Sequence, residues 1–143
     1  MLRVVVDPGV FIAALISQDG APAQLLPRWF GGQFQIVTSP ELRLEFLRVT
    51  SRPKFRAWFS IEEAREFDRL IEITAEGSSD VLTDAALPSD DGDGYLVQLT
   101  VSSEAFALVT GDKLLASHQT NGFRALSPRE FVALLDRLET TFG

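Results

Sequence analysis

The stretch LRVVVD, Leu2–Asp7, decides how the rest of the sequence is interpreted. Its run of β-branched residues predicts a buried strand rather than one with a solvent-facing side. The strand ends at Asp7-Pro8-Gly9, and helix-compatible residues follow from Val10. An acid at this position needs a cation, hydrogen-bond donors or water, because burying an isolated carboxylate is costly. Asp7 therefore either caps the next helix or belongs to a ligand site at the carboxyl edge of a sheet.

Strands and helices are predicted to alternate along the chain. Further strands are expected at 34–38, 71–75, 106–110 and 123–126, and helices at 10–17, 21–30, 39–49, 60–71, 93–101, 113–117 and 127–138. Hydroxyl residues begin three of these helices in capping patterns, namely Ser39-Pro40, Ser60 with Glu63, and Ser127 with Glu130. This order predicts a three-layer α/β/α fold with a central, mostly parallel sheet flanked by helices.

The composition limits the class of protein. A chain of 143 residues with 45% apolar residues predicts one globular domain over residues 1–143. No apolar run approaches the roughly 18 residues of a membrane span, and no basic-then-apolar leader follows Met1. The absence of cysteine excludes disulfides, thiolate metal sites and a cysteine nucleophile. We therefore expect a cytoplasmic protein that does not enter a membrane.

The net charge of −7 is distributed unevenly. Residues 70–112 carry nine acids and no lysine or arginine, whereas residues 46–61 carry bases and no acid. An acidic protein repels nucleic acid at long range, but a bound cation beside a basic patch would reverse this locally. The patch supplies four candidate RNA contacts, beside Phe55 and Trp58 as possible stacking platforms: Arg48, Arg52, Lys54 and Arg56. The alternative is a solvated loop in which both aromatic residues are buried.

Acids recur where predicted elements begin or end. Asp7 and Asp112 follow two buried strands, and the carboxyl ends of parallel strands share one edge. Asp93 begins a helix, and Glu45 lies on an earlier one. Carboxylates brought together there would repel one another unless a cation neutralised them, and Mg²⁺ and Mn²⁺ prefer such oxygen ligands. That chemistry suits metal-assisted hydrolysis of phosphodiesters, whereas the alternative is a set of unrelated surface acids and helix caps.

Six segments in order resemble one family over nearly the full length. They are LRVVVD with VFIAALIS, then GAPAQLL, SPEL through EFLRV with RPKF, DGDGYL, LVTGD, and SPREF near the end. Together they resemble the PIN domain, and specifically its bacterial and archaeal members that act as toxins of type II toxin–antitoxin systems (VapC-like ribonucleases).

The resemblance implies a function and a site. It implies an endoribonuclease that depends on Mg²⁺ or Mn²⁺ and acts on single-stranded or structured RNA, with Asp7, Glu45, Asp93 and Asp112 as catalytic metal ligands. Thr110 matches a position whose hydroxyl supports the acids. Asp7, Glu45 and Asp93 would hold the principal ion, and Asp112 would help to hold a second ion or a water. The resemblance also implies a homodimer and a cognate antitoxin protein.

Three positions depart from the family pattern. Gly9 stands where an asparagine is usual, Gly94 replaces a basic residue after the third acid, and Leu114 replaces a further acid. Loss of the asparagine at position 9 would loosen the orientation of Asp7, Gly94 would remove a phosphate contact, and Leu114 would weaken a second metal site. Because all four principal acids remain, we expect catalysis. The alternative is a degenerate PIN fold that binds RNA or a protein partner without cleavage.

Overall fold

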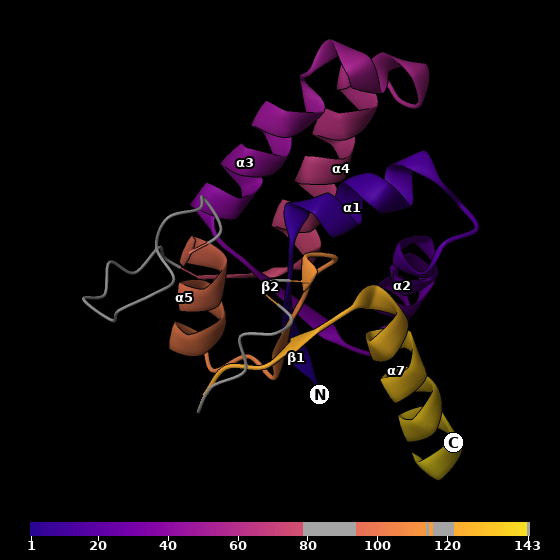
Figure 1. Cartoon of the computed structure of the whole chain (residues 1–143), viewed down its shortest axis with the longest axis vertical. Coiled ribbons are helices and arrows are strands. Elements are labelled where there is room, and N and C mark those ends of the chain that lie inside the picture. Colours follow the sequence, from indigo (N-terminus) through magenta and orange to yellow (C-terminus); the bar gives the residue numbers. More distant parts are fainter. Residues whose placement is uncertain (79–93, 114, 116–121, 143) are drawn as a thin grey trace.

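A parallel sheet forms the centre of the molecule (Figure 1). The computed structural model describes residues 1–78, 94–113, 115 and 122–142. In this part of the chain the sheet has the strand order β3-β2-β1-β4-β5, with every neighbouring pair parallel. The strands are β1 Arg3–Val6, β2 Gln35–Thr38, β3 Glu76–Gly77, β4 Ala107–Val109 and β5 Ala125–Leu126. The predicted opening strand is thus the central one, and Val5 lies opposite both Val37 and Leu108.

Helices cover both faces of the sheet. They are α1 Pro8–Ile16, α2 Ala21–Phe30, α3 Pro40–Thr50, the 3₁₀ helix η1 Pro53–Ala57, α4 Ile61–Thr74, α5 Gly94–Ser102 and α7 Pro128–Phe142. Figure 1 shows α5 on one side of the sheet and α2 and α7 on the other, while α1, α3 and α4 extend beyond the carboxyl ends of the strands. The predicted three-layer α/β/α fold is confirmed.

Aromatic packing holds α1, α3 and α4 together above the sheet. The ring of Phe46 on α3 contacts Phe11 on α1 and Phe67 on α4, with centroid separations of 6.2 and 5.6 Å. Phe11 and Phe67 also contact each other at 5.4 Å. Since Phe46 is fully buried, its packing fixes the position of α3 and hence of its neighbour Glu45.

The three helix starts predicted from capping residues are confirmed, whereas the first helix begins at Pro8, two residues earlier than expected. The Ser39 hydroxyl accepts a hydrogen bond from the backbone N–H of Leu42 at 3.2 Å. Ser60 and Glu63 exchange reciprocal hydrogen bonds of 2.9 and 3.0 Å, and a similar pair begins α7: Ser127 and Glu130. These side chains satisfy backbone N–H groups that have no partner inside a helix.

The predicted strand at 71–75 is wrong, because α4 continues to Thr74 and β3 contains only Glu76–Gly77. Ile71 and Ile73 gave this segment the composition of a strand, but Ile71 lies four residues after Phe67 on the buried face of the helix. The last helix is longer than expected and ends at Phe142. The predicted helix at 113–117 lies mostly outside the described residues.

A buried ion pair joins α3 to α4. Arg43 donates from two guanidinium nitrogens to the Asp68 carboxylate, at 3.0 and 2.9 Å, and from a third to Glu72 at 2.8 Å. The hydrogen bond to Asp68 is the main cause that raises the pKa of Arg43. Because Asp68 is buried, removing Arg43 would leave a carboxylate without its partner, so this pair fixes how α3 and α4 are aligned.

Replacing Phe46 with alanine tests the role of this packing. We expect Phe46→Ala to lower the free energy of unfolding by about 3–5 kcal/mol, since it leaves a cavity among three helices. The matched control is Leu44→Ala on the same helix, where the side chain is 67% exposed and a change within about 0.5 kcal/mol is expected. Urea denaturation measures both, and equal effects of the two variants would contradict the assignment.

Candidate metal centre

Asp7 lies at the carboxyl end of β1, and its two oxygens have different partners. Oδ1 accepts a hydrogen bond from the backbone N–H of Gly9 at 2.9 Å, so Asp7 is the N-cap of α1. Oδ2 accepts one from the Thr110 hydroxyl at 2.8 Å. The sequence left open whether Asp7 caps a helix or belongs to a site at the sheet edge. In the structure one carboxylate oxygen caps α1, and the other accepts a hydrogen bond from Thr110, which follows β4.

Thr110 connects two of the predicted acids. It follows β4 and is almost fully buried. Its hydroxyl donates to Asp7 and accepts a hydrogen bond from the backbone N–H of Asp112 at 3.1 Å. The side chain of Asp112 is half-buried. Thr110 therefore links the loop that carries Asp112 to the carboxylate of Asp7.

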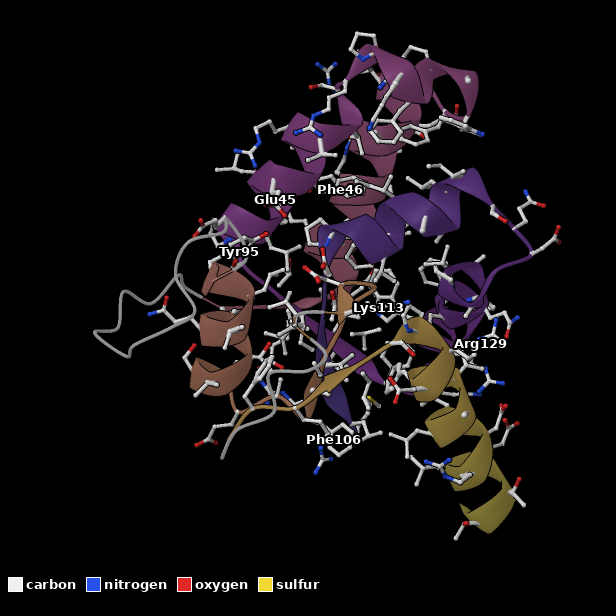
Figure 2. All side chains as sticks on the ribbon, viewed as in Figure 1. Glu45, Phe46, Tyr95, Phe106, Lys113 and Arg129 are labelled. Atoms are coloured by element: carbon white, nitrogen blue, oxygen red, sulfur yellow. The ribbon has the colours of Figure 1, made fainter. Side chains whose placement is uncertain are left out.

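Glu45 is held by a residue that sequence reasoning did not single out. The Tyr95 hydroxyl, on the first turn of α5, donates to Glu45 Oε2 at 2.8 Å. Figure 2 shows the two side chains meeting between α3 and α5. On the other side, Arg48 Nη2 lies 3.6 Å from Glu45 Oε1. The only sequence signal for Tyr95 was its place beside Asp93 in the family-like DGDGYL segment, and an aromatic residue there is readily taken for core.

The pKa of Tyr95 is raised well above its usual range. The main cause is burial, followed by the hydrogen bond to Glu45 and then by the negative charges of Glu45, Asp7 and Glu41. Tyr95 therefore remains a protonated donor over the physiological pH range.

The oxygen-rich surroundings fit a hard divalent cation in their chemistry. A carboxylate has about four lone-pair sites, so the single donor on each oxygen of Asp7 leaves capacity for a cation. Within the described residues, no three Asp, Glu, His or Cys side chains come together in a group that could hold a metal ion. Asp7, Glu45 and Asp112 thus do not complete a site by themselves. The fourth predicted ligand, Asp93, lies outside the described residues.

The four candidate RNA contacts all have exposed side chains. Arg48 lies on α3, one turn after Glu45, and the others lie in or beside η1. Arg56 also has a structural role, because its Nη2 donates to the carbonyls of Thr50 and Arg52 at the end of α3. Of the two neighbouring aromatic residues, Phe55 is buried and Trp58 is 53% exposed.

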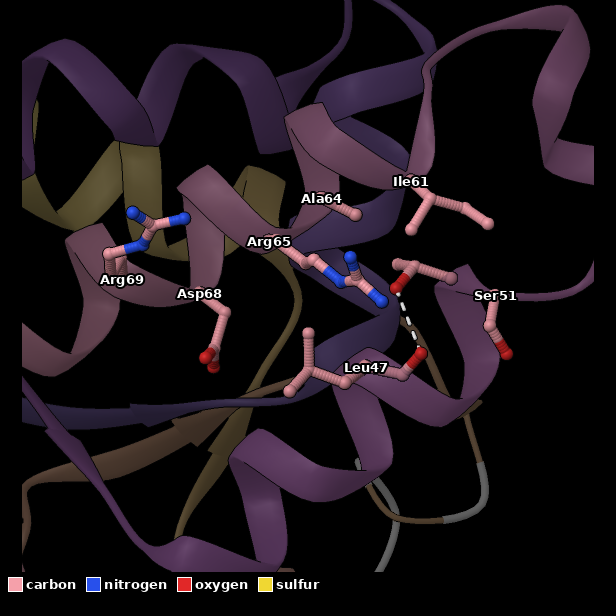
Figure 3. A pocket seen from close by; sticks show the side chains of 8 residues that line it. Leu47, Ser51, Ile61, Ala64, Arg65, Asp68 and Arg69 are labelled. Carbon is pink, nitrogen blue, oxygen red and sulfur yellow. Dashed lines mark hydrogen bonds between the residues drawn. The ribbon is translucent and has the colours of Figure 1, made fainter.

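A cavity of about 430 Å³ lies between α3 and α4 and is separate from the predicted metal ligands (Figure 3). Arg65 and Arg69 line it, together with Asp68, whose carboxylate is already bound by Arg43. None of the predicted metal ligands is among its lining residues. No helix in the described segments is long and apolar enough to cross a membrane.

The site thus includes a hydrogen-bonded acid, Asp7, at the carboxyl edge of a parallel sheet. A family model described as PIN domain matches residues 3–114, and the chain belongs to the PIN domain family. The chain is also 31% identical over 121 residues to the uncharacterized protein MJ1680 of Methanocaldococcus jannaschii, an alignment that covers 81% of this chain and 74% of that protein. PIN domains are generally nucleases that use divalent metal ions and act on RNA or DNA.

Tyr95→Phe tests whether the hydroxyl holds Glu45 for metal binding. The variant keeps the ring and removes the donor, and we expect Mn²⁺ affinity to fall about 10–100-fold, as is typical when the partner of a metal ligand is lost. Isothermal titration calorimetry measures the affinity, with Ser102→Ala, an exposed position on the same helix, as the control. Equal affinities for Tyr95→Phe and the wild type would show that the hydroxyl has no such role.

Proposed function

We propose that this chain is a divalent-metal-dependent endoribonuclease that hydrolyses RNA phosphodiester bonds. The observation that carries the proposal is that two of the predicted acids, Asp7 and Glu45, each accept a hydrogen bond from a hydroxyl on another element of the fold. Each carboxylate has a fixed donor, Thr110 for Asp7 and Tyr95 for Glu45. Such fixed acids in an oxygen-only environment favour Mg²⁺ or Mn²⁺.

The proposed ligands of the principal ion are Asp7, Glu45 and Asp93. Asp93 precedes Tyr95 by two residues, and the Tyr95 hydroxyl binds Glu45, so chain connectivity supports its inclusion. Asp112, linked to Asp7 through Thr110, would help to hold a second ion or a water. A bound divalent ion would activate water for attack and offset the charge that develops on the phosphate.

Hydrogen bonds from neighbouring residues fix the orientation of the proposed ligand Asp7. Thr110 and the Gly9 N–H hold the two oxygens of Asp7 in one orientation. A side chain at position 9 would place its Cβ 3.5 Å from Asp7 Oδ1, which is ordinary contact. An asparagine would therefore fit at position 9, and glycine lacks its side-chain amide while keeping the backbone donor to Asp7. Gly94 is the first residue of α5, and Leu114 lies outside the described residues.

The biological role that we propose is that of a cytoplasmic toxin with a cognate antitoxin, acting as a homodimer. The sequence segments shared with PIN toxins support this role, and an antitoxin that carries an arginine could neutralise the acids around Tyr95. The alternative is a non-cleaving PIN module that binds RNA or protein, and the residues that favour it are Gly94 and Leu114, which replace a basic residue and an acid of the family pattern.

Asp7→Asn tests the nuclease. The substitution keeps the size of the side chain and removes a carboxylate ligand. We expect the rate of metal-dependent cleavage to fall by at least about 100-fold. Loss of a residue that only hydrogen-bonds to a metal ligand already lowers activity about 10–100-fold. The substrate is a covalently closed single-stranded RNA, which only an endonuclease can open, incubated with Mn²⁺.

Asp19→Asn, at an exposed acid outside the candidate site, is the matched control and should cleave like the wild type. Undiminished cleavage by Asp7→Asn would refute the assignment. Complete inactivity of the wild-type protein, with no Mn²⁺ binding at millimolar concentration, would favour the non-cleaving module.

A further inference from the structure

The connection between α3 and α4 forms a compact tip with one large exposed ring. Phe55 and Phe59 stack inside the tip, with centroids 5.6 Å apart and planes at 15°, and both are buried. The indole of Trp58 packs against Phe55 at 6.5 Å, but more than half of its surface remains accessible to solvent. Phe55 is thus unavailable to a ligand, whereas Trp58 presents an open aromatic surface.

The tip is held by its own hydrogen bonds. The backbone N–H groups of Trp58 and Phe59 both donate to the carbonyl of Phe55, at 3.0 and 3.1 Å. Arg56 donates to the carbonyls of Thr50 and Arg52, which ties the tip to the end of α3. A fixed aromatic surface loses little conformational entropy when a planar group stacks on it.

The charged residues in the segment that carries Trp58 are all basic. Lys54 lies 5.1 Å from the centroid of the Phe55 ring, and the Arg56 guanidinium lies 5.6 Å from that of Phe59, both with exposed side chains. The segment from residue 46 to 61 contains no acid in a chain whose net charge is −7. A cation-rimmed indole suits a polyanion that carries planar groups.

Cations also connect the tip to the acids. Arg48 follows Glu45 by one turn on the same side of α3, and Arg52 lies just beyond the end of that helix, as the N-cap of η1. With a rise of 1.5 Å per residue, the axis of α3 advances about 8 Å from Glu45 to its last residue, Thr50. These cations therefore lie between the tip and Glu45 along the chain.

We propose that Trp58 is a base-stacking platform that selects single-stranded RNA, with Arg48, Arg52 and Lys54 along the path of its phosphates. Single-strand binding sites combine a basic track with aromatic side chains in this way, whereas the bases of a duplex are stacked on one another and cannot reach the indole. The choice of RNA as the ligand rests on the proposed function, but binding to Trp58 needs neither metal nor cleavage.

The RNA affinity of Trp58→Ala is measured by the fluorescence anisotropy of a labelled ten-nucleotide uridine RNA. The buffer contains EDTA, so that metal-dependent cleavage is absent. We expect affinity to fall about tenfold or more, within the range for losing one aromatic stacking partner. Trp58→Phe retains a ring and should recover most of the affinity. Phe30→Ala removes another ring, 51% exposed on α2, and should bind like the wild type.

Tryptophan emission gives a second readout of the same binding. The chain has two tryptophans, and Trp29 is buried between Phe11 and Phe30. Quenching by the uridine RNA should therefore come from Trp58 and vanish in Trp58→Phe when the spectra are compared. A duplex of the same length should cause less quenching than the single strand.

Equal RNA affinity of Trp58→Ala and the wild type would overturn the inference, as would no binding of the single strand by the wild type. A protein-concentration-dependent shift of Trp58 emission without RNA would assign the ring to a protein contact and would also overturn it. Loss of affinity in Trp58→Ala together with an inactive wild-type protein would support the stacking platform while the proposed nuclease function failed.

Discussion

The two oxygens of the Asp7 carboxylate accept hydrogen bonds from two donors that are far apart in the chain, Gly9 and Thr110. The candidate site depends on this pair of hydrogen bonds. One oxygen receives the N–H of Gly9 and starts α1, while the other receives the hydroxyl of Thr110 and faces β4. The orientation of the acid is therefore set by the fold before any ligand arrives. Such preorganisation is what a metal or phosphate site requires, because the cost of ordering the ligands is met during folding.

Helix α3 has three different roles on three of its sides. Phe46 lies in the aromatic core, Arg43 binds Asp68 on α4, and Glu45 faces Tyr95 on α5. The first two contacts fix the rotation of the helix and so direct Glu45 toward Tyr95. At its far end the same helix leads into a tip whose charge is opposite to that of the acids, so α3 spans the two kinds of surface that an RNA hydrolase needs.

Features of the fold that depend on local chemistry could be predicted from the sequence. The hydroxyl of Ser39 and the pair Ser60 with Glu63 mark helix starts because they satisfy backbone groups within three residues. Ile71 misled the prediction because a β-branched residue on the buried face of a helix has the composition of a strand. Tyr95 was missed because its partner, Glu45, is 50 residues away, and no local pattern distinguishes such a hydroxyl from a core ring.

The separation of Asp7 and Thr110 along the chain has a consequence for protein synthesis. Their hydrogen bond joins residues 103 positions apart, and β1 cannot pair with β4 until the intervening helices have been made. Contacts that close so long a loop form late, since the entropy of closure must be met first. A partly synthesised chain therefore lacks the arrangement around Asp7. If the complete fold cleaves RNA, the messenger being translated is exposed to that activity only after most of this domain has left the ribosome.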